Sequence, residues 1–535
     1  MSRTLGVYLQ SLSMRVWLFA LLLCAVTVFA YQPAWHGGFV WDDDRYVTNN
    51  PLLTAPDGLR RIWFSLDAPS QYFPLSYTVL MIGRSLWGLN PEGYHWLNLS
   101  LHIANALLVW ALLSRLKVPG AWLASAIFAL HPVQVESVAW ISELKNVLMG
   151  LFFLLTLLVW TEFLDAQTAR RWILYAAALL FYFLALSAKT TACTLPAALL
   201  LIVWLKKQPI TRGIILQIIP FGALASGMGL LAIWWEKYHQ GTRMLMTLPP
   251  LERLLIATRA IWFYLSKIFW PSNLTFIYPR WNVDPKDLTA YLWLVGCGAA
   301  CAAIWFARRR FGRGIEVAAL FFVSTLGPLL GFIMLYTFRY TFVADHYQYL
   351  ASIGLIALVA AALVRLSQSI RHGRSLLIAA SSVILGCLGL LTWRQSEMFR
   401  DAETLWRITL ARNPGCWMAY NNLGILELTK GDINEAIRSY ERSVSLYRDQ
   451  PEAHYNLGGA LLQQGKLEEA IVQCKIALRL NPNDPDAHVV LGNALLSKND
   501  VEEAISEYTR ALSLYPDDVQ ARHNLGIALQ QRGQQ

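Results

Sequence analysis

Three consecutive carboxylates, Asp42, Asp43 and Asp44, follow directly after the first apolar segment of the chain. Ionised carboxylates are too costly to lie deep in lipid, so we expect them at the membrane surface or outside it. Crowded carboxylates repel one another, which raises the pKa of at least one and makes it a candidate general base. An alternative interpretation is a solvated acidic loop that serves only topology. A divalent-cation site at Asp42 and Asp44 is a further alternative, although the chain lacks the strand-helix alternation of a soluble nucleotide-sugar domain.

Polar and charged residues also interrupt three later apolar stretches. These are the segment from His131 to Asn146, which contains Glu136, then Lys189 between two apolar runs, and the segment from Arg339 to Tyr349, which contains His346. Charges in such positions usually face a cavity. Taken singly, each is more often an interfacial anchor, because aromatic belts and snorkelling lysines are common in membrane proteins. The hypothesis of a shared site depends on these three stretches and the aspartate segment all lying on one side of the membrane.

Positioning these segments requires a helical membrane domain. Of the 535 residues 56% are hydrophobic and only 15% are charged, and a spanning helix needs about 20 mostly apolar residues. We expect about eleven spans in an all-α membrane domain over residues 1–395, at 15–34, 94–114, 119–131, 145–164, 172–188, 192–205, 213–235, 289–307, 315–336, 350–366 and 375–393. The amphipathic stretch 251–270 is interrupted by basic residues and is expected to be interfacial or re-entrant.

The distribution of positive charge predicts the orientation. Lysine and arginine outnumber aspartate and glutamate by 45 to 35, but they occur as small clusters between apolar runs, which argues against nucleic-acid binding. Six such clusters fall on one face, which the positive-inside rule makes cytoplasmic. We therefore expect a multi-pass plasma (inner) membrane protein with a cytoplasmic N-terminus. The loop 35–93 and everything after residue 393 would share the outer compartment.

The last part of the chain has a different composition and an internal repeat of 34 residues. A Leu-Gly pair recurs at 423–424, 457–458, 491–492 and 525–526, and an alanine recurs at 402, 436, 470 and 504. This spacing is typical of tetratricopeptide repeats. We expect an α-solenoid over residues 400–535, made of a half repeat (400–413), three repeats (417–450, 451–484 and 485–518) and a partial repeat (519–535).

Asparagines recur at one position of these repeats, as Asn422, Asn456 and Asn524, with Val490 breaking the series. Repeat arrays of this kind present a concave groove to extended peptides. The three amides could hydrogen-bond the main chain of a bound peptide, or they could serve local packing.

The motifs together resemble a known family. The combination of Phe39-Val40-x-Asp42-Asp43, His131-Pro132-x-x-x-Glu136-x-x-Ala139-Trp140, Lys189 and Tyr347-x-Tyr349-Leu350, followed by tetratricopeptide repeats, resembles the transmembrane-and-TPR O-mannosyltransferases of the GT-C glycosyltransferase superfamily. The resemblance implies transfer of a sugar, typically mannose, from a polyprenyl-phosphate carrier to a protein hydroxyl outside the cytoplasm. It places Asp42 and Asp43 at the catalytic centre, with Asp44 as an additional acid.

The resemblance leads to a scheme in which an aspartate accepts the proton of a serine or threonine hydroxyl during one inverting displacement. Lys189, Arg339 and His346 are the candidate partners of the donor phosphate, and His131 and Glu136 complete the predicted cavity. The repeats would recruit the acceptor protein, and the scheme requires no metal or other cofactor. Two alternatives remain open: a non-catalytic membrane scaffold for envelope or secretion assembly, and a GT-C enzyme with a lipid or polysaccharide acceptor.

Overall fold

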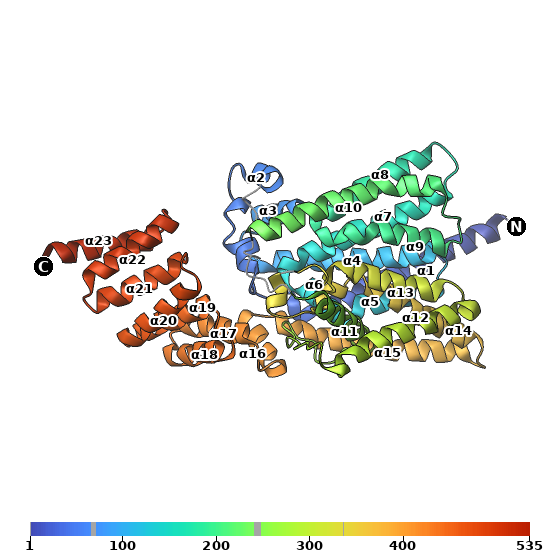
Figure 1. Cartoon of the computed structure of the whole chain (residues 1–535). Coiled ribbons are helices and arrows are strands. Elements are labelled where there is room, and N and C mark those ends of the chain that lie inside the picture. Colours follow the sequence, from blue (N-terminus) through green and yellow to red (C-terminus); the bar gives the residue numbers. More distant parts are fainter. Residues whose placement is uncertain (1, 66–70, 240–247, 335, 535) are drawn as a thin grey trace. The chain divides into compact units, whose positions relative to one another are not determined.

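The computed structural model describes residues 2–65, 71–239, 248–334 and 336–534 as two compact units, residues 1–404 and 405–535. Within these ranges the chain forms α-helices and short 3-10 or π turns and no β-strand, which confirms the predicted all-α class (Figure 1). The first unit contains fifteen helices before residue 400: α1 (Ser2–Ala30), α2 (Gly58–Phe64), α3 (Pro74–Trp87), α4 (Pro91–Arg115), α5 (Ala121–Leu130), α6 (Val135–Ala139), α7 (Leu144–Asp165), α8 (Arg170–Ala188), α9 (Leu195–Leu205), α10 (Arg212–His239), α11 (Pro250–Phe269), α12 (Leu292–Phe311), α13 (Gly314–Leu326), α14 (Ser352–Gln368) and α15 (Gly373–Ser396).

Each of the eleven predicted apolar segments overlaps one of these helices. Among the described residues, six helical segments are long and apolar enough to cross a membrane by length and composition: Pro91–Arg115, Ile141–Asp165, Arg170–Ala188, Arg212–Trp235, Leu288–Phe311 and Gly373–Phe399. The other five are shorter apolar helices. The chain therefore has the helices of a multi-pass membrane protein, while the count of eleven crossings and their orientation stay predictions.

One predicted boundary is wrong. The sequence pattern places a helix over 315–336, whereas α13 ends at Leu326 and only a 3-10 turn, Gly327–Leu329, follows it. Pro328 has no backbone N–H to continue the helix, and Gly331 has a φ of +100°, which only glycine adopts easily. The chain consequently leaves the α-helical path here, and side chains of residues 330–334 and 336–349 are available to line a site.

A second interruption, between α5 and α7, positions most of the polar residues. α5 ends at Leu130 because His131 precedes Pro132 and takes the extended conformation that proline imposes on its neighbour, with a ψ of 126°. After the short helix α6, the backbone is extended again at Trp140, with a ψ of 118°. Residues 131–146 are all buried, so their polar side chains point into the unit and not to lipid.

Helices α4, α7, α8, α9 and α10 pack together on one side of the first unit, and α5, α13, α14 and α15 pack on the other (Figure 1). Buried polar side chains tie these groups together. Asn105 of α4 donates hydrogen bonds to the carbonyl oxygen of Val147 (2.8 Å) and to the hydroxyl of Tyr349 (2.9 Å), and His102 Nδ1 lies 2.8 Å from the same hydroxyl. Tyr349 of the sequence motif is thus an internal structural group.

The second unit is a series of paired helices. After α16 (Ala402–Arg412), the pairs are α17 (Trp417–Thr429) with α18 (Ile433–Leu446), α19 (Pro451–Gln463) with α20 (Leu467–Leu480), and α21 (Pro485–Ser497) with α22 (Val501–Leu514), followed by α23 (Val519–Gln534).

The repeated glycines allow close packing within each pair. A Cβ atom on Gly492 would lie 2.6 Å from the ring of Tyr508, and one on Gly458 would lie 2.6 Å from the Cys474 sulfur. Real Cβ atoms do not approach other atoms so closely, so any larger residue at either position would force the packed side chain to shift. A Cβ atom on Gly526 of α23 would meet no atom of another described helix within 4 Å, so this glycine is not needed for close packing.

Candidate active site

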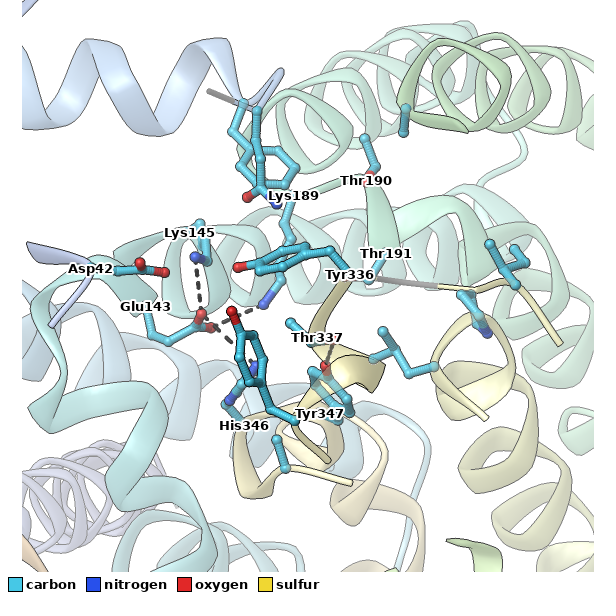
Figure 2. Close-up of a pocket in the computed structure, with 18 of the residues that line it drawn as sticks. Asp42, Glu143, Lys145, Lys189, Thr190, Thr191, Tyr336, Thr337, His346 and Tyr347 are labelled. Atoms are coloured by element: carbon cyan, nitrogen blue, oxygen red, sulfur yellow. Dashed lines mark hydrogen bonds and ion pairs between the residues drawn. The ribbon is translucent and has the colours of Figure 1, made fainter. Parts of the chain in front are cut away.

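A cavity of about 450 Å³ lies in the first unit. Its wall has a charged part, made by Asp42, Glu136, Glu143, Lys145, Lys189 and His346. An apolar part is made by Gly229, Ala232, Ile233 and Trp235 of α10 and by Pro328, Leu329, Ile333 and Met334 after α13. Figure 2 shows the charged side chains gathered on one side of this cavity. A cavity with these two linings suits an amphipathic ligand with a polar head and an apolar tail.

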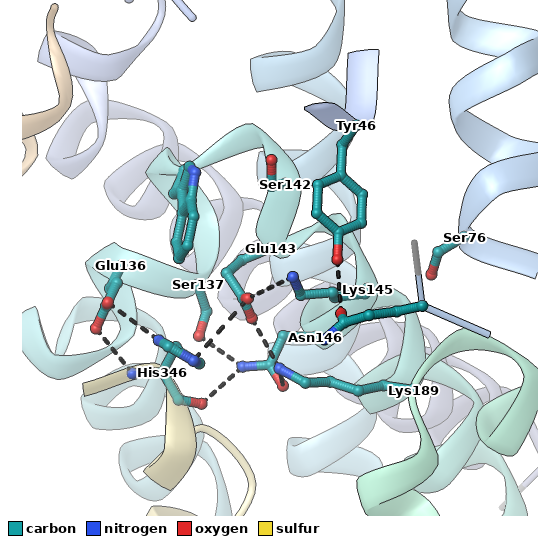
Figure 3. A network of polar contacts seen from close by, with 12 residues as sticks. Tyr46, Ser76, Glu136, Ser137, Ser142, Glu143, Lys145, Asn146, Lys189 and His346 are labelled. Carbon is teal, nitrogen blue, oxygen red and sulfur yellow. Dashed lines mark hydrogen bonds and ion pairs between the residues drawn. The ribbon is translucent and has the colours of Figure 1, made fainter. Parts of the chain in front are cut away.

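Glu143 lies at the centre of the charged side chains. Its carboxylate is 1% exposed and lies 3.1 Å from Nζ of Lys145 and 2.9 Å from Nζ of Lys189. His346 Nε2 lies 4.0 Å from the same carboxylate. Figures 2 and 3 show dashed contacts from the Glu143 carboxylate to both lysines. A buried carboxylate is stable only with such partners, and two buried ammonium groups in one cavity provide positive charge for an anionic ligand.

A second acid, Glu136, holds the segment around His346 in place. His346 Nδ1 lies 3.0 Å from one carboxylate oxygen of Glu136, and the backbone N–H of His346 donates to the other oxygen at 3.0 Å. Asn146 donates to the carbonyl oxygen of His346 (2.7 Å) and accepts a hydrogen bond from Lys189 (3.4 Å). This network connects segments far apart in sequence (Figure 3).

The three consecutive aspartates have different environments. Asp42 lines the cavity, where burial raises the pKa of its carboxyl and the positive charges of Lys145 and Arg45 partly oppose that rise. Asp43 is fully buried and accepts hydrogen bonds from the N–H of Val40 (2.9 Å), the N–H of Ser142 (2.8 Å) and the hydroxyl of Ser142.

Burial raises the pKa of Asp43 to about 7, against the lowering effect of those hydrogen bonds. Asp44 is exposed and accepts a hydrogen bond from Thr48 at 2.9 Å. Of the three acids, Asp42 is thus the one in the cavity wall, while Asp43 attaches its loop to the segment before α7.

The remaining predicted cavity residues do not line the cavity. His131 is buried, and its Nε2 lies 2.9 Å from the carbonyl oxygen of Ile268. Arg339 is exposed. Of the five residues predicted for the donor phosphate and its cavity, the structure thus brings together Lys189, His346 and Glu136.

The asparagines of the repeats use their amide groups within the array. Asn456 donates to the side-chain oxygen of Asn421 (3.1 Å), and Asn524 donates to that of Asn493 (2.7 Å), so each joins the first helices of neighbouring repeats. Asn422 donates to the carbonyl oxygen of Met418 in its own helix at 2.8 Å. These contacts favour the packing interpretation for the N–H groups, and the predicted role in binding a peptide main chain stays untested.

No group of three or more histidine, cysteine, aspartate or glutamate side chains that could hold a metal ion occurs among the residues that the structure describes. The predicted cation site at Asp42 and Asp44 has one residue in the cavity wall and the other at the surface. It stays a prediction.

Sequence analysis did not select several residues that make up this site, above all Glu143 and Lys145. Both carry charge at the start of an apolar segment of 25 residues, and an ionisable group within a membrane helix is a functional candidate by default. That signal was present in the sequence. Tyr336 and Tyr340 also line the cavity, and they are available to do so because α13 ends early, which the hydrophobic pattern concealed.

Comparisons with known proteins agree with the predicted resemblance. A "Tetratricopeptide repeat" profile matches residues 388–444 and 422–485, and a "TPR repeat" profile matches residues 492–533. Protein O-mannosyl-transferase TMTC4 from Homo sapiens is 28% identical over 163 residues, covering 26% of this chain and 22% of that protein. Protein O-mannosyl-transferase TMTC1 from Mus musculus is 31% identical over 163 residues, covering 28% of this chain and 17% of that protein.

The chain therefore spans about a fifth of the length of these curated relatives. Among solved structures, the first TPR of RPAP3 bound to an HSP90 peptide covers 22% of this chain and 93% of that chain, with 25% identity and a TM-score of 0.22. The comparisons confirm that the chain carries tetratricopeptide repeats, and over about a quarter of its length it is similar to proteins named protein O-mannosyl-transferases.

Proposed function

We propose that this protein is a membrane glycosyltransferase that moves mannose from a polyprenyl-phosphate carrier to serine or threonine hydroxyls of proteins outside the cytoplasm. The observation that carries the proposal is the cavity with a charged and an apolar lining. The names of the relatives, protein O-mannosyl-transferases, support the reaction class.

The donor fits the two linings of the cavity. A polyprenyl phosphate has one anionic group attached to a long apolar chain. The phosphate would lie against Lys145 and Lys189, whose present partner is Glu143. The apolar chain would follow the wall formed by α10 and the residues after α13. A fixed pair of cations in a buried cavity stabilises the negative charge that develops on a departing phosphate.

Asp42 would act as the general base. The hydroxyl oxygen of the acceptor attacks the anomeric carbon while its proton passes to the Asp42 carboxylate. The bond between the anomeric carbon and the phosphate oxygen breaks, and its electron pair leaves with the polyprenyl phosphate. A single displacement inverts the anomeric configuration. Asp43 is unsuited to this role because it is 0% exposed and its carboxylate is occupied by hydrogen bonds. A carboxyl whose pKa is raised by burial is a stronger base once it is ionised.

The repeats would recruit the acceptor polypeptide. Tetratricopeptide arrays are protein-binding modules, and binding an acceptor on the same chain raises its concentration near the catalytic cavity. This part of the proposal requires the array and Asp42 to face the same aqueous compartment, as the charge pattern of the spans predicts.

A transfer assay with the purified full chain, a mannosyl-phosphate polyprenol and serine- or threonine-containing peptides tests the proposal. We expect Asp42→Asn to lower the rate by about 10²–10⁴, the usual contribution of a general base. The matched control is Asp44→Asn, which changes an exposed neighbouring acid and should keep most of the activity.

Unchanged transfer by Asp42→Asn would exclude Asp42 as the base. Absence of transfer by the wild-type protein, to peptides as well as to lipid and polysaccharide acceptors, would favour the scaffold alternative. Addition of a chelator to the same assay tests the predicted cation site, because the proposed scheme needs no metal.

A further inference from the structure

Four aromatic side chains form a continuous group in the cavity wall next to Asp42. Trp41 stacks on Trp140 with ring centroids 5.8 Å apart and an interplanar angle of 19°. Phe276 meets both rings edge-on, at 5.3 Å from Trp41 and 5.0 Å from Trp140, and Tyr340 meets Trp41 edge-on at 6.4 Å. We call these four residues the aromatic group; all of them line the cavity.

Trp41 is held in an unfavourable backbone conformation. Its φ is +43°, in the left-handed region that residues other than glycine rarely occupy. Such a conformation is energetically unfavourable and persists only where the surroundings enforce it, and it is enriched at ligand sites. The hydrogen bonds from Val40 and Ser142 to Asp43 fix the chain on both sides of this point. The strain therefore presents the indole of Trp41 to the cavity directly beside Asp42.

The aromatic group is continuous with the cation site. The Trp140 ring has Lys145 Nζ at 5.7 Å and the His346 ring at 6.0 Å, while its other neighbours are Trp41 and Phe276. Trp140 thus connects Lys145 with the remaining aromatic rings. A ligand with its phosphate at the lysines would place the next chemical group against these rings.

We propose that the aromatic group is the binding site for the sugar ring of the donor. One face of a hexopyranose carries mainly C–H groups, which pack well on an aromatic ring, while its hydroxyls point sideways to polar partners. The sugar is covalently attached to the phosphate, so it must lie next to the lysines that would bind the phosphate. The inference rests on the proposed function and adds to it the residues that distinguish a glycosylated carrier from a sugar-free one.

The test compares two lipids on the purified full chain in lipid nanodiscs: a polyprenyl phosphate, and the same lipid carrying mannose on its phosphate. The dissociation constant of each is measured for wild type, Trp41→Leu and Tyr340→Leu. Trp270→Leu is the matched control, because Trp270 is 76% exposed and lies outside the cavity. Lys189→Met serves as the reference for the phosphate contact.

We expect Trp41→Leu to weaken binding of the mannosyl lipid about tenfold, equal to about 1.4 kcal/mol, and to leave binding of the sugar-free lipid unchanged. Tyr340→Leu should act in the same direction with a smaller effect, and Trp41→Phe should restore most of the preference because it retains a ring. Lys189→Met should weaken binding of both lipids by a similar factor, and Trp270→Leu should weaken binding of neither.

An unchanged ratio of the two dissociation constants in Trp41→Leu, or in Tyr340→Leu where the first variant does not fold, would overturn the assignment of the aromatic group and leave the proposed function in place. Failure of the wild-type protein to bind either lipid would overturn both. The two failures are therefore distinguishable in one experiment.

Discussion

Replacing Glu143 by glutamine would leave Lys145 and Lys189 without the carboxylate that they share. The glutamate side chain is 1% exposed and the two lysine side chains are 9% and 10% exposed, so solvent compensates little for the lost charge. Removing one partner of a buried ion pair typically costs about 3–5 kcal/mol, because the remaining charge is uncompensated. Here two ammonium groups are affected, and we expect a destabilisation at the upper end of that range.

The matched control is Glu162→Gln at the other end of the same apolar segment. Glu162 lies 2.8 Å from Arg115, but the two side chains are 39% and 44% exposed. Exposed pairs contribute at most about 1 kcal/mol. Thermal unfolding of both variants in detergent, followed by tryptophan fluorescence, should show a decrease in apparent Tm of several degrees for Glu143→Gln and little change for Glu162→Gln.

The proposed function adds a second, opposite expectation. A polyprenyl phosphate would replace the missing carboxylate between the lysines, so the ligand should raise the Tm of Glu143→Gln more than that of wild type. Ligand at 100 times its dissociation constant stabilises a folded protein by about 2.7 kcal/mol, which is measurable in this assay. A Glu143→Gln protein as stable as wild type would refute the account of the ion pair. A variant that is destabilised but gains less from the lipid than wild type would refute the assignment of the lysines to the phosphate.

Two further predictions concern other parts of the chain. Gly492→Ala should destabilise the pair α21 and α22 by about 1–3 kcal/mol, because its Cβ would overlap the Tyr508 ring. Gly526→Ala should be neutral or stabilising by up to about 1 kcal/mol. Hydrogen exchange of the full chain measures both variants, and equal effects would contradict the packing argument. Arg45 is exposed and its charge lowers the pKa of Asp42. Since transfer needs ionised Asp42, activity falls as the pH drops through that pKa, and Arg45→Gln should move this acid limb to higher pH because it removes a charge that lowers the pKa of Asp42. High salt should reduce the pH shift between this variant and wild type. An acid limb that moved to lower pH would contradict the expected direction.

The helical elements were largely predictable. Spans such as 94–114 and 213–235 are recognisable because about 20 apolar residues in a row satisfy a local requirement of the bilayer. The 34-residue repeat is equally local, since each unit repeats the same close contact between its two helices. The end of α13 was missed because residues 327–336 are as apolar as a helix, and hydrophobicity alone does not report the break at Pro328 and Gly331.

The site was predictable only in part. Lys189, His346 and Glu136 stood out as charges among apolar residues, and the structure brings them to one cavity. The same argument selected His131 and Arg339, which do not line it. A charge in an apolar segment predicts that a partner exists, but not whether that partner is a cavity, a backbone carbonyl or solvent.

By itself, the sequence determined the approximate position of the apolar helices, the repeat array and the resemblance to a glycosyltransferase family, because each follows from local pattern or short motifs. Only the tertiary structure decided which acid faces the cavity. Asp42, Asp43 and Asp44 are indistinguishable in composition, and the hydrogen bonds from Val40 and Ser142 to Asp43 orient the whole loop. One of those donors lies 99 residues away along the chain, and such long-range contacts leave no periodic signal in the sequence.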